Sequence, residues 1–275
     1  MPTRVARHAR PFAATAALAA ATLTALLVST PASAQTTVHY VALGDSYSSG
    51  VGAGSYTSSS GSCDRSTKAY SQLWATAYDP ASYVSVACSG ATTSTVISGQ
   101  LSALSSATTL ISLTVGGNDV GFSSVMETCV LHSTSSCVSA IDASEAKMAS
   151  ALPGSLNSVL GDIAADAPNA HVVVLGYPDL YDLSKSAGCV GLSTTDRTDL
   201  NAAAAELDGK ISAAAAAFGD FYVNVQPYFA GHEICDSSSW LHSVNVLDLG
   251  ESYHPTATGQ ADGYEPALAH GVSES

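Results

Sequence analysis

The chain has 275 residues, of which 46% are hydrophobic and 12% charged, and its formal net charge is −14. A protein this acidic is repelled by the phosphates of nucleic acids and by anionic membranes, so the composition argues against both as partners.

The N-terminus has the layout of a secretory signal peptide. Three arginines within the first ten residues form a basic head, residues 12–28 are uncharged and rich in Ala and Leu, and a small-residue cleavage site ends at Ala34. A membrane anchor is the alternative, but the run is short for a span and its Ala and Thr are only weakly apolar. We therefore expect a signal peptide over residues 1–34 and a secreted domain over residues 35–275, with a monomer as the default. Without the three arginines, six basic residues remain against 23 acidic ones, a formal charge of −17.

Strands and helices alternate along the rest of the chain. The sequence predicts strands over 38–43, 83–87, 110–115, 170–178 and 221–226. Between and after them it predicts helices over 69–78, 144–165 and 196–218 and a closing helix from residue 254. We expect Pro153 to break the second helix, and Thr194, Thr195 or Asp196 to cap the third. Apolar strands separated by helices predict an α/β fold with a central parallel sheet covered on both faces. Active-site residues of such sheets gather at the carboxyl ends of the strands.

Six cysteines remain in the mature chain. An even number in an exported protein favours three disulfides over free thiols. Fifteen pairings can be drawn, and the order along the chain suggests that neighbours pair: Cys63–Cys88, Cys129–Cys137 and Cys189–Cys235. The middle pair would enclose a short polar loop over residues 130–136. No C-x-x-C spacing indicates a zinc site and no EF-hand spacing indicates calcium, so we expect no metal.

Four segments carry candidate chemistry to the carboxyl edge of the sheet. The first strand runs into GDSYSSG with Ser46, the second ends near Gly90, the third ends in GGND with Asn118, and an HP pair near the C-terminus holds His254. Ester hydrolysis needs a nucleophile, a base and donors for a developing oxyanion. Ser46 suits the nucleophile, and His254 suits the base because an imidazole ordinarily has a pKa near 6.5. The backbone N–H groups of Ser46 and Gly90 and the Asn118 amide suit the oxyanion.

These segments resemble the four motif blocks of the GDSL, or SGNH, hydrolase family, and most closely its secreted bacterial lipases and esterases. The stretch GHEICD…WLH over residues 231–242 resembles the loop before their His block. The resemblance implies a three-layer α/β/α flavodoxin-like fold, three sequential disulfides, and hydrolysis of lipid or other acyl esters, phospholipids included, with no cofactor. Relatives that deacetylate carbohydrates such as acetylxylan make that activity the alternative. A non-catalytic secreted binding protein on the same scaffold is the rival from another class.

The His block departs from the family pattern of Asp-x-x-His, because Glu251 stands three residues before His254. Its longer side chain need not reach the imidazole, and some relatives orient the His with a main-chain carbonyl, which Ser252 would supply here. We favour a Ser46–His254 dyad held by that carbonyl over a triad with Glu251. The other histidines of the mature chain, His242 among them, are expected to be core or surface residues.

Overall fold

The computed structural model describes residues 1–3, 37–185, 189, 191–244 and 249–274. The chain divides into two units, Met1–Thr36 and Thr37–Ser275, and the fold belongs to the second. The expected signal peptide lies almost entirely outside the described residues. Among the residues that the structure describes, no helix is both long and apolar enough to cross a bilayer.

A five-stranded parallel sheet forms the centre of the domain, as the sequence predicted. Its strands lie in the order β2-β1-β3-β4-β5, and their bounds are β1 His39–Gly44, β2 Ser82–Ser85, β3 Leu110–Thr114, β4 His171–Leu175 and β5 Phe221–Val223. Every residue of β3 is buried, as expected of an inner strand that is covered on both faces. Strand β2 pairs with one edge of β1, and β3, the next strand along the chain, pairs with the other edge. The strand order therefore reverses between β1 and β3. Ligands of open α/β sheets bind at such a reversal, outside the carboxyl ends of the strands.

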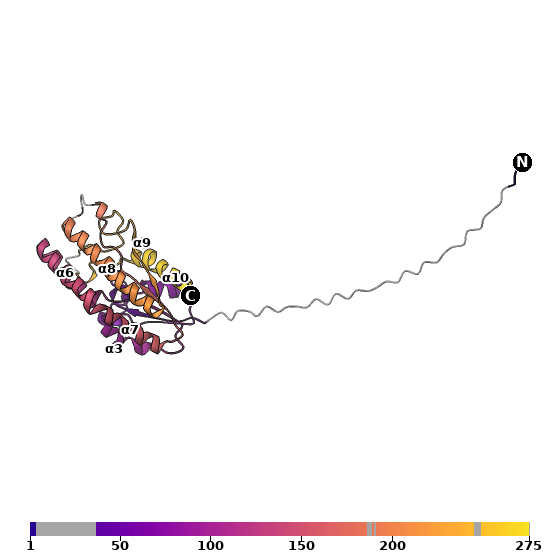
Figure 1. The fold of residues 1–275 in the computed structure, drawn as a ribbon, viewed down its shortest axis with the longest axis horizontal. Helices are drawn as coiled ribbons and strands as arrows, with labels where there is room; N and C mark the ends of the chain where they lie inside the picture. Colours follow the sequence, from indigo (N-terminus) through magenta and orange to yellow (C-terminus); the bar gives the residue numbers. More distant parts are fainter. Residues whose placement is uncertain (4–36, 186–188, 190, 245–248, 275) are drawn as a thin grey trace. The chain divides into compact units, whose positions relative to one another are not determined.

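Helices cover both faces of the sheet and give three layers (Figure 1). One face carries α2 (Tyr70–Tyr78) and α10 (Glu265–Ser273), which pack against each other. The other face carries α3 (Thr93–Gly99), α7 (Leu152–Asp166) and α8 (Thr194–Phe218), and α6 (Thr134–Ser150) packs against α7 and α8. The expected α/β/α flavodoxin-like fold is therefore confirmed.

Several helix boundaries differ from the sequence predictions. The helix expected over residues 144–165 is two helices, α6 and α7, which meet at Ala151. The break at Pro153 is confirmed, because this proline stands in the first turn of α7, where a missing N–H costs no hydrogen bond. Helix α8 is capped by Ser193, one residue before the three candidates, and Asp196 bonds back to the Ser193 N–H.

The closing helix begins later than predicted. Residues Gly259–Tyr264 form one stretch of π-helix, which continues into α10. The residues directly after His254 are therefore not helical.

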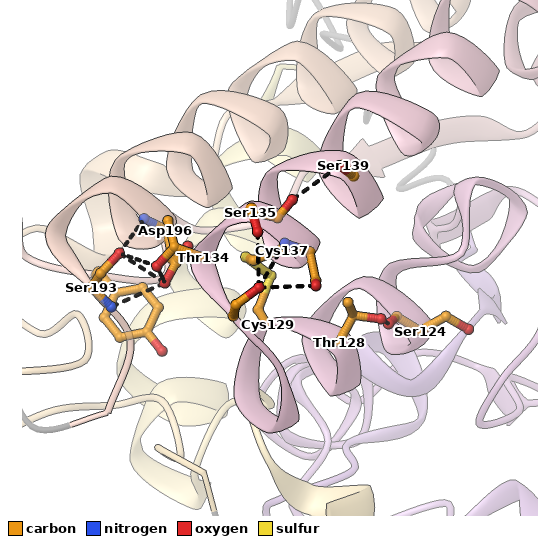
Figure 2. Close-up of a disulfide and its surroundings, with 12 residues drawn as sticks. Ser124, Thr128, Cys129, Thr134, Ser135, Cys137, Ser139, Ser193 and Asp196 are labelled. Atoms are coloured by element: carbon orange, nitrogen blue, oxygen red, sulfur yellow. Dashed lines mark hydrogen bonds between the residues drawn. A yellow bond between two sulfur atoms is a disulfide. The ribbon is translucent and has the colours of Figure 1, made fainter.

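All six cysteines are paired as Cys63–Cys88, Cys129–Cys137 and Cys189–Cys235. The middle disulfide joins α5 (Phe122–Leu131) to the first turn of α6 (Figure 2). The prediction of a polar loop over residues 130–136 is wrong, because most of these residues belong to the two helices. The bridge therefore fixes one helix against the next.

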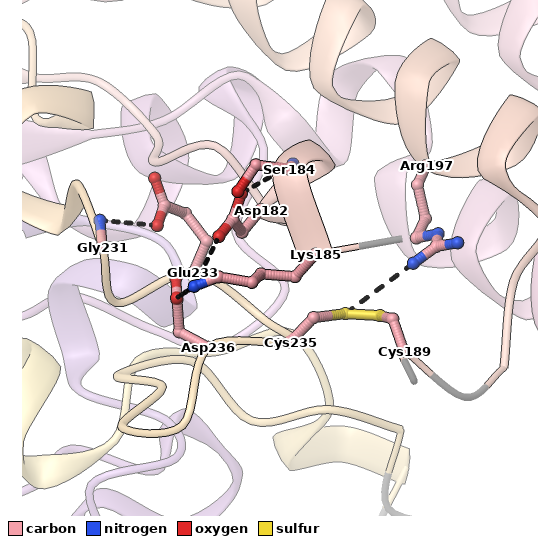
Figure 3. A network of polar contacts seen from close by, with 9 residues as sticks. All are labelled: Asp182, Ser184, Lys185, Cys189, Arg197, Gly231, Glu233, Cys235 and Asp236. Atoms are coloured by element: carbon pink, nitrogen blue, oxygen red, sulfur yellow. Dashed lines mark hydrogen bonds and ion pairs between the residues drawn. A yellow bond between two sulfur atoms is a disulfide. The ribbon is translucent and has the colours of Figure 1, made fainter. Parts of the chain in front are cut away.

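The third disulfide lies beside a surface network of charges (Figure 3). Lys185 Nζ lies 3.7 Å from Asp182 Oδ2 and 3.4 Å from Asp236 Oδ1. The Lys185 side chain is half exposed, so solvent weakens both ion pairs, and the Cys189–Cys235 bond is the stronger constraint on this part of the chain.

Candidate active site

The nucleophile candidate stands in a tight turn at the end of β1. Gly44 has φ +122°, and a Cβ built on it would lie 2.4 Å from the Thr114 carbonyl oxygen, so only glycine fits. The Asp45 N–H donates to the same carbonyl at 2.9 Å, and the Asp45 side chain caps the four-residue helix α1 (Ser46–Ser49). Ser46 is therefore held at the N-terminus of a helical turn with 8% of its surface exposed.

The structure brings Ser46 and His254 together from positions 208 residues apart. His254 Nε2 lies 2.7 Å from Ser46 Oγ, and His254 Nδ1 lies 3.1 Å from the Ser252 carbonyl oxygen. A carbonyl oxygen can only accept, so Nδ1 carries the proton and Nε2 is free to accept from the serine hydroxyl. Desolvation lowers the pKa of His254 to about 4, so the imidazole is neutral near pH 7.

The Glu251 carboxylate is bound elsewhere. It accepts a hydrogen bond of 2.5 Å from the Tyr56 hydroxyl, and that hydroxyl accepts one of 2.9 Å from the Gly52 N–H. Only the main-chain oxygen of Glu251 bonds to His254, accepting from its N–H at 3.2 Å. The side chain thus links the His254 loop to the loop after the nucleophile.

His242 supports the loop that carries His254, a role that sequence reasoning missed. Its N–H donates to the His254 carbonyl at 2.9 Å, and its ring Nε2 lies 2.7 Å from the Gly52 carbonyl. Gly52 is closely packed here, because a Cβ on it would lie 2.7 Å from the Pro255 carbonyl oxygen and 3.0 Å from the His254 Cβ. The WLH stretch that ends at His242 was marked only by its likeness to the family, and it did not indicate this contact.

The GGND segment holds the loop that contains Gly90. Asn118 lies in α4 (Gly117–Val120) and donates from Nδ2 to the Ala91 carbonyl at 3.0 Å. The next residue, Asp119, accepts from the Thr93 N–H at 3.0 Å and from its hydroxyl at 2.6 Å. Gly90 has φ +76°, a conformation that favours glycine. The candidate amide and the candidate glycine loop are therefore neighbours.

Tyr177 joins the nucleophile turn to the GGND segment. Its hydroxyl donates to Asp45 Oδ2 at 2.5 Å and accepts from the Gly117 N–H at 3.1 Å. Burial raises the pKa of the Asp45 carboxyl to about 7. Nothing in the sequence marked Tyr177, since its role depends on a contact across 132 positions.

The arrangement holds the parts that acyl transfer requires. The Ser46 hydroxyl faces a neutral imidazole whose other nitrogen is fixed, and the Asn118 amide lies beside the loop that contains Gly90 at the same edge of the sheet. Among the described residues, no group of three or more His, Cys, Asp or Glu side chains is placed to hold a metal ion.

Comparisons with known proteins agree with this geometry. The model of the GDSL-like Lipase/Acylhydrolase family matches residues 42–261. Lipase 1 of Streptomyces coelicolor is 57% identical over 229 residues, which cover 83% of this chain and 85% of the relative. The crystal structure of phospholipase A1 from Streptomyces albidoflavus superposes with a TM-score of 0.82 at 53% identity and covers 84% of this chain and 98% of its own. The crystal structure of the extracellular lipase from Streptomyces rimosus has a TM-score of 0.83 at 48% identity, and the match covers 85% of this chain and 99% of the lipase.

Proposed function

The chain belongs to the GDSL-like lipase/acylhydrolase family, and from this premise we propose that it is a secreted serine hydrolase that cleaves lipid or other acyl esters through an acyl-enzyme on Ser46. Its relatives, which include two lipases and a phospholipase A1, indicate that it is a carboxylic ester hydrolase. The observation that carries the proposal is the 2.7 Å contact between His254 Nε2 and Ser46 Oγ.

In the proposed first half-reaction Ser46 Oγ forms a bond to the ester carbonyl carbon, and its proton passes to His254 Nε2. The carbonyl oxygen becomes an oxyanion that accepts from the N–H groups of Ser46 and Gly90 and from the Asn118 amide. Each such donor lowers the barrier by about 3 kcal/mol. The ester C–O bond then breaks, and Nε2 returns the proton to the leaving alcohol.

The second half-reaction repeats these steps with water. Nε2 takes a proton from the water as its oxygen attacks the acyl carbon, and the acid leaves as Ser46 recovers its proton. The imidazolium formed in each half is stabilised by its Nδ1–H bond to the Ser252 carbonyl. This contact of 3.1 Å supports a dyad in which Glu251 is not the orienting acid.

The signal-peptide layout of residues 1–34 and the likeness to an extracellular lipase support secretion. The protein recovered from a culture medium is expected to begin at Gln35, which N-terminal sequencing tests. We expect it to elute as a monomer in size-exclusion chromatography, without a cofactor.

The experiment that tests the proposal replaces Ser46 by Ala in the mature protein. The variant is expected to lose both hydrolysis of p-nitrophenyl butyrate and labelling by a fluorophosphonate probe, with an unchanged circular dichroism spectrum. Ser49→Ala is the matched control, because the Ser49 hydroxyl donates to the Ser46 carbonyl within the same turn and not to the imidazole. Full activity in Ser46→Ala would refute the proposal. A panel that includes acetylated xylan separates acyl-ester hydrolysis from carbohydrate deacetylation.

A further inference from the structure

A groove of about 340 Å³ opens beside His254 and is lined mainly by apolar side chains. One wall is helix α5, and the facing wall is formed by Val244 and by residues of the 249–254 stretch. The lining residues are Phe122, Ser123, Met126, Glu127, Val130, Leu131, Val244, Leu249, Gly250, Ser252, Tyr253 and His254. We call this feature the α5 groove.

The α5 groove runs along the length of its helix. Phe122, Met126 and Val130 recur every four residues and therefore lie on one face of α5. The eight residue steps from the first to the last of these span about 12 Å at 1.5 Å per step. Leu131 and Leu249 stand at the lining with 59% and 57% of their surfaces exposed. Large apolar side chains left this open beside a groove mark a surface that binds an apolar ligand.

The near end of the groove meets the candidate reaction centre. Helix α5 begins at Phe122, four residues after Asn118, with only Gly121 between α4 and α5. His254 and Ser252 are themselves part of the lining. An acyl group attached to Ser46, with its oxygen at Asn118, would thus have its carbon chain beside Phe122, where the groove starts.

The charge of the groove selects hydrocarbon over an anionic head group. Of the described lining residues, Glu127 alone carries a formal charge near pH 7, and this carboxylate would repel a phosphate group. The remaining surface offers side chains such as Met126, whose flexible thioether adapts to chains of different shape.

The Cys129–Cys137 disulfide holds the far half of α5 against α6 (Figure 2). This wall of the groove is therefore fixed by a covalent bond near the end that lies away from His254. A rigid wall binds an apolar chain without the loss of conformational entropy that ordering a mobile helix would cause.

We propose that the α5 groove binds the acyl chain of the ester, with the carboxyl end at His254 and the methyl end towards Leu131 and Leu249. The inference rests on the proposed function, and it assigns acyl-chain preference to residues outside the four motif segments.

The test measures the ratio of kcat/KM for p-nitrophenyl octanoate to kcat/KM for p-nitrophenyl acetate. Val130→Trp fills the far part of the groove, and Leu131→Asp places a charge at its open end. Each variant is expected to lower this ratio about tenfold, equivalent to lost burial of roughly two methylene groups, whereas the control keeps it within about twofold. The control is Ser124→Trp, which adds the same side chain to the exposed part of α5 outside the lining.

Two failures can be told apart. Absence of ester hydrolysis in the wild type would overturn the proposed function and the groove assignment with it. An active wild type whose two groove variants are labelled by the fluorophosphonate yet keep the wild-type ratio would overturn the groove assignment alone. Where circular dichroism shows that Val130→Trp is unfolded, the exposed Leu131→Asp site decides.

Discussion

The Tyr56 hydroxyl donates a hydrogen bond to the Glu251 carboxylate at 2.5 Å. Glu251 occupies the position at which the family commonly has the acid that orients the histidine, yet it is bound to the loop that follows the nucleophile. Desolvation raises the pKa of Tyr56 to about 12, so this hydroxyl stays protonated and remains a donor near neutral pH. The contact explains how a longer acid can stay in the His block without holding the imidazole.

Glu251→Gln is therefore expected to retain most activity, because Gln still accepts from Tyr56 and the Ser252 carbonyl still holds His254. We expect kcat within about fivefold of the wild type, against a loss on the order of a thousandfold or more in His254→Ala. Steady-state rates on one soluble ester compare the two variants. An equal loss in both would restore a triad with Glu251.

The pH dependence of the wild type should reflect the lowered pKa of His254. The base acts only when neutral, and desolvation lowers its pKa to about 4. We expect kcat/KM to stay level from about pH 8 to pH 5 and to fall about tenfold per unit below about pH 4. Initial rates on a soluble ester give this profile over the range in which circular dichroism shows a folded protein. An acidic limb centred near pH 6.5 would contradict the expectation.

Asn118→Ala should lower kcat by about 10²–10³-fold with a small change in KM, because the lost amide acts on charge that develops in the transition state. The same change removes the bond to the Ala91 carbonyl, which we expect to cost about 1 kcal/mol of unfolding free energy. Thermal unfolding measures this loss separately from the kinetics. A variant that is less stable but has wild-type kcat would show that Asn118 only supports the glycine loop.

Asp208→Asn is expected to stabilise the protein in neutral solution. Burial raises the pKa of Asp208 in the folded state to about 7, whereas an unfolded Asp has a pKa of about 3.9. Between these values the unfolded chain has released the proton and the folded protein keeps it, so the free energy of unfolding falls as pH rises from about 4 to 7. Below that window both states are protonated and the loss is absent.

The Asn side chain cannot ionise and still accepts from the Tyr177 N–H, as Asp208 does. The unfolding midpoint of the variant should therefore exceed that of the wild type at pH 8 and depend less on pH between 4 and 7. Asp45, whose pKa is also raised to about 7, keeps part of the dependence. Melting curves at pH 4, 6 and 8 test this, and identical slopes for the two proteins would contradict it.

The sequence alone predicted the sheet because its inner strands are buried on both faces and are therefore rich in apolar residues, as in β4. It also marked the four chemical segments, since each follows a strand or precedes a proline in a recognisable pattern. It did not predict a helix over α5, whose Ser, Thr, Val and Cys residues have modest helix propensity. That helix is stabilised by packing and by its disulfide to α6.

The roles of residues that act through contacts distant in sequence also could not be predicted from the sequence. Tyr177 reaches Asp45 across 132 positions and His242 reaches Gly52 across 190, and neither contact leaves a local pattern. Ser193 was missed as a cap for a different reason, because several neighbouring residues suit that role equally well.

Gly52 meets the His254 loop with no side chain of its own, so this close approach and the side-chain bonds of His242 and Glu251 together fix the gap between the two catalytic loops. Substitutions in the walls of the substrate site need not disturb that gap. Substrate preference and reactivity can therefore be redesigned independently in this protein, provided that position 52 stays glycine.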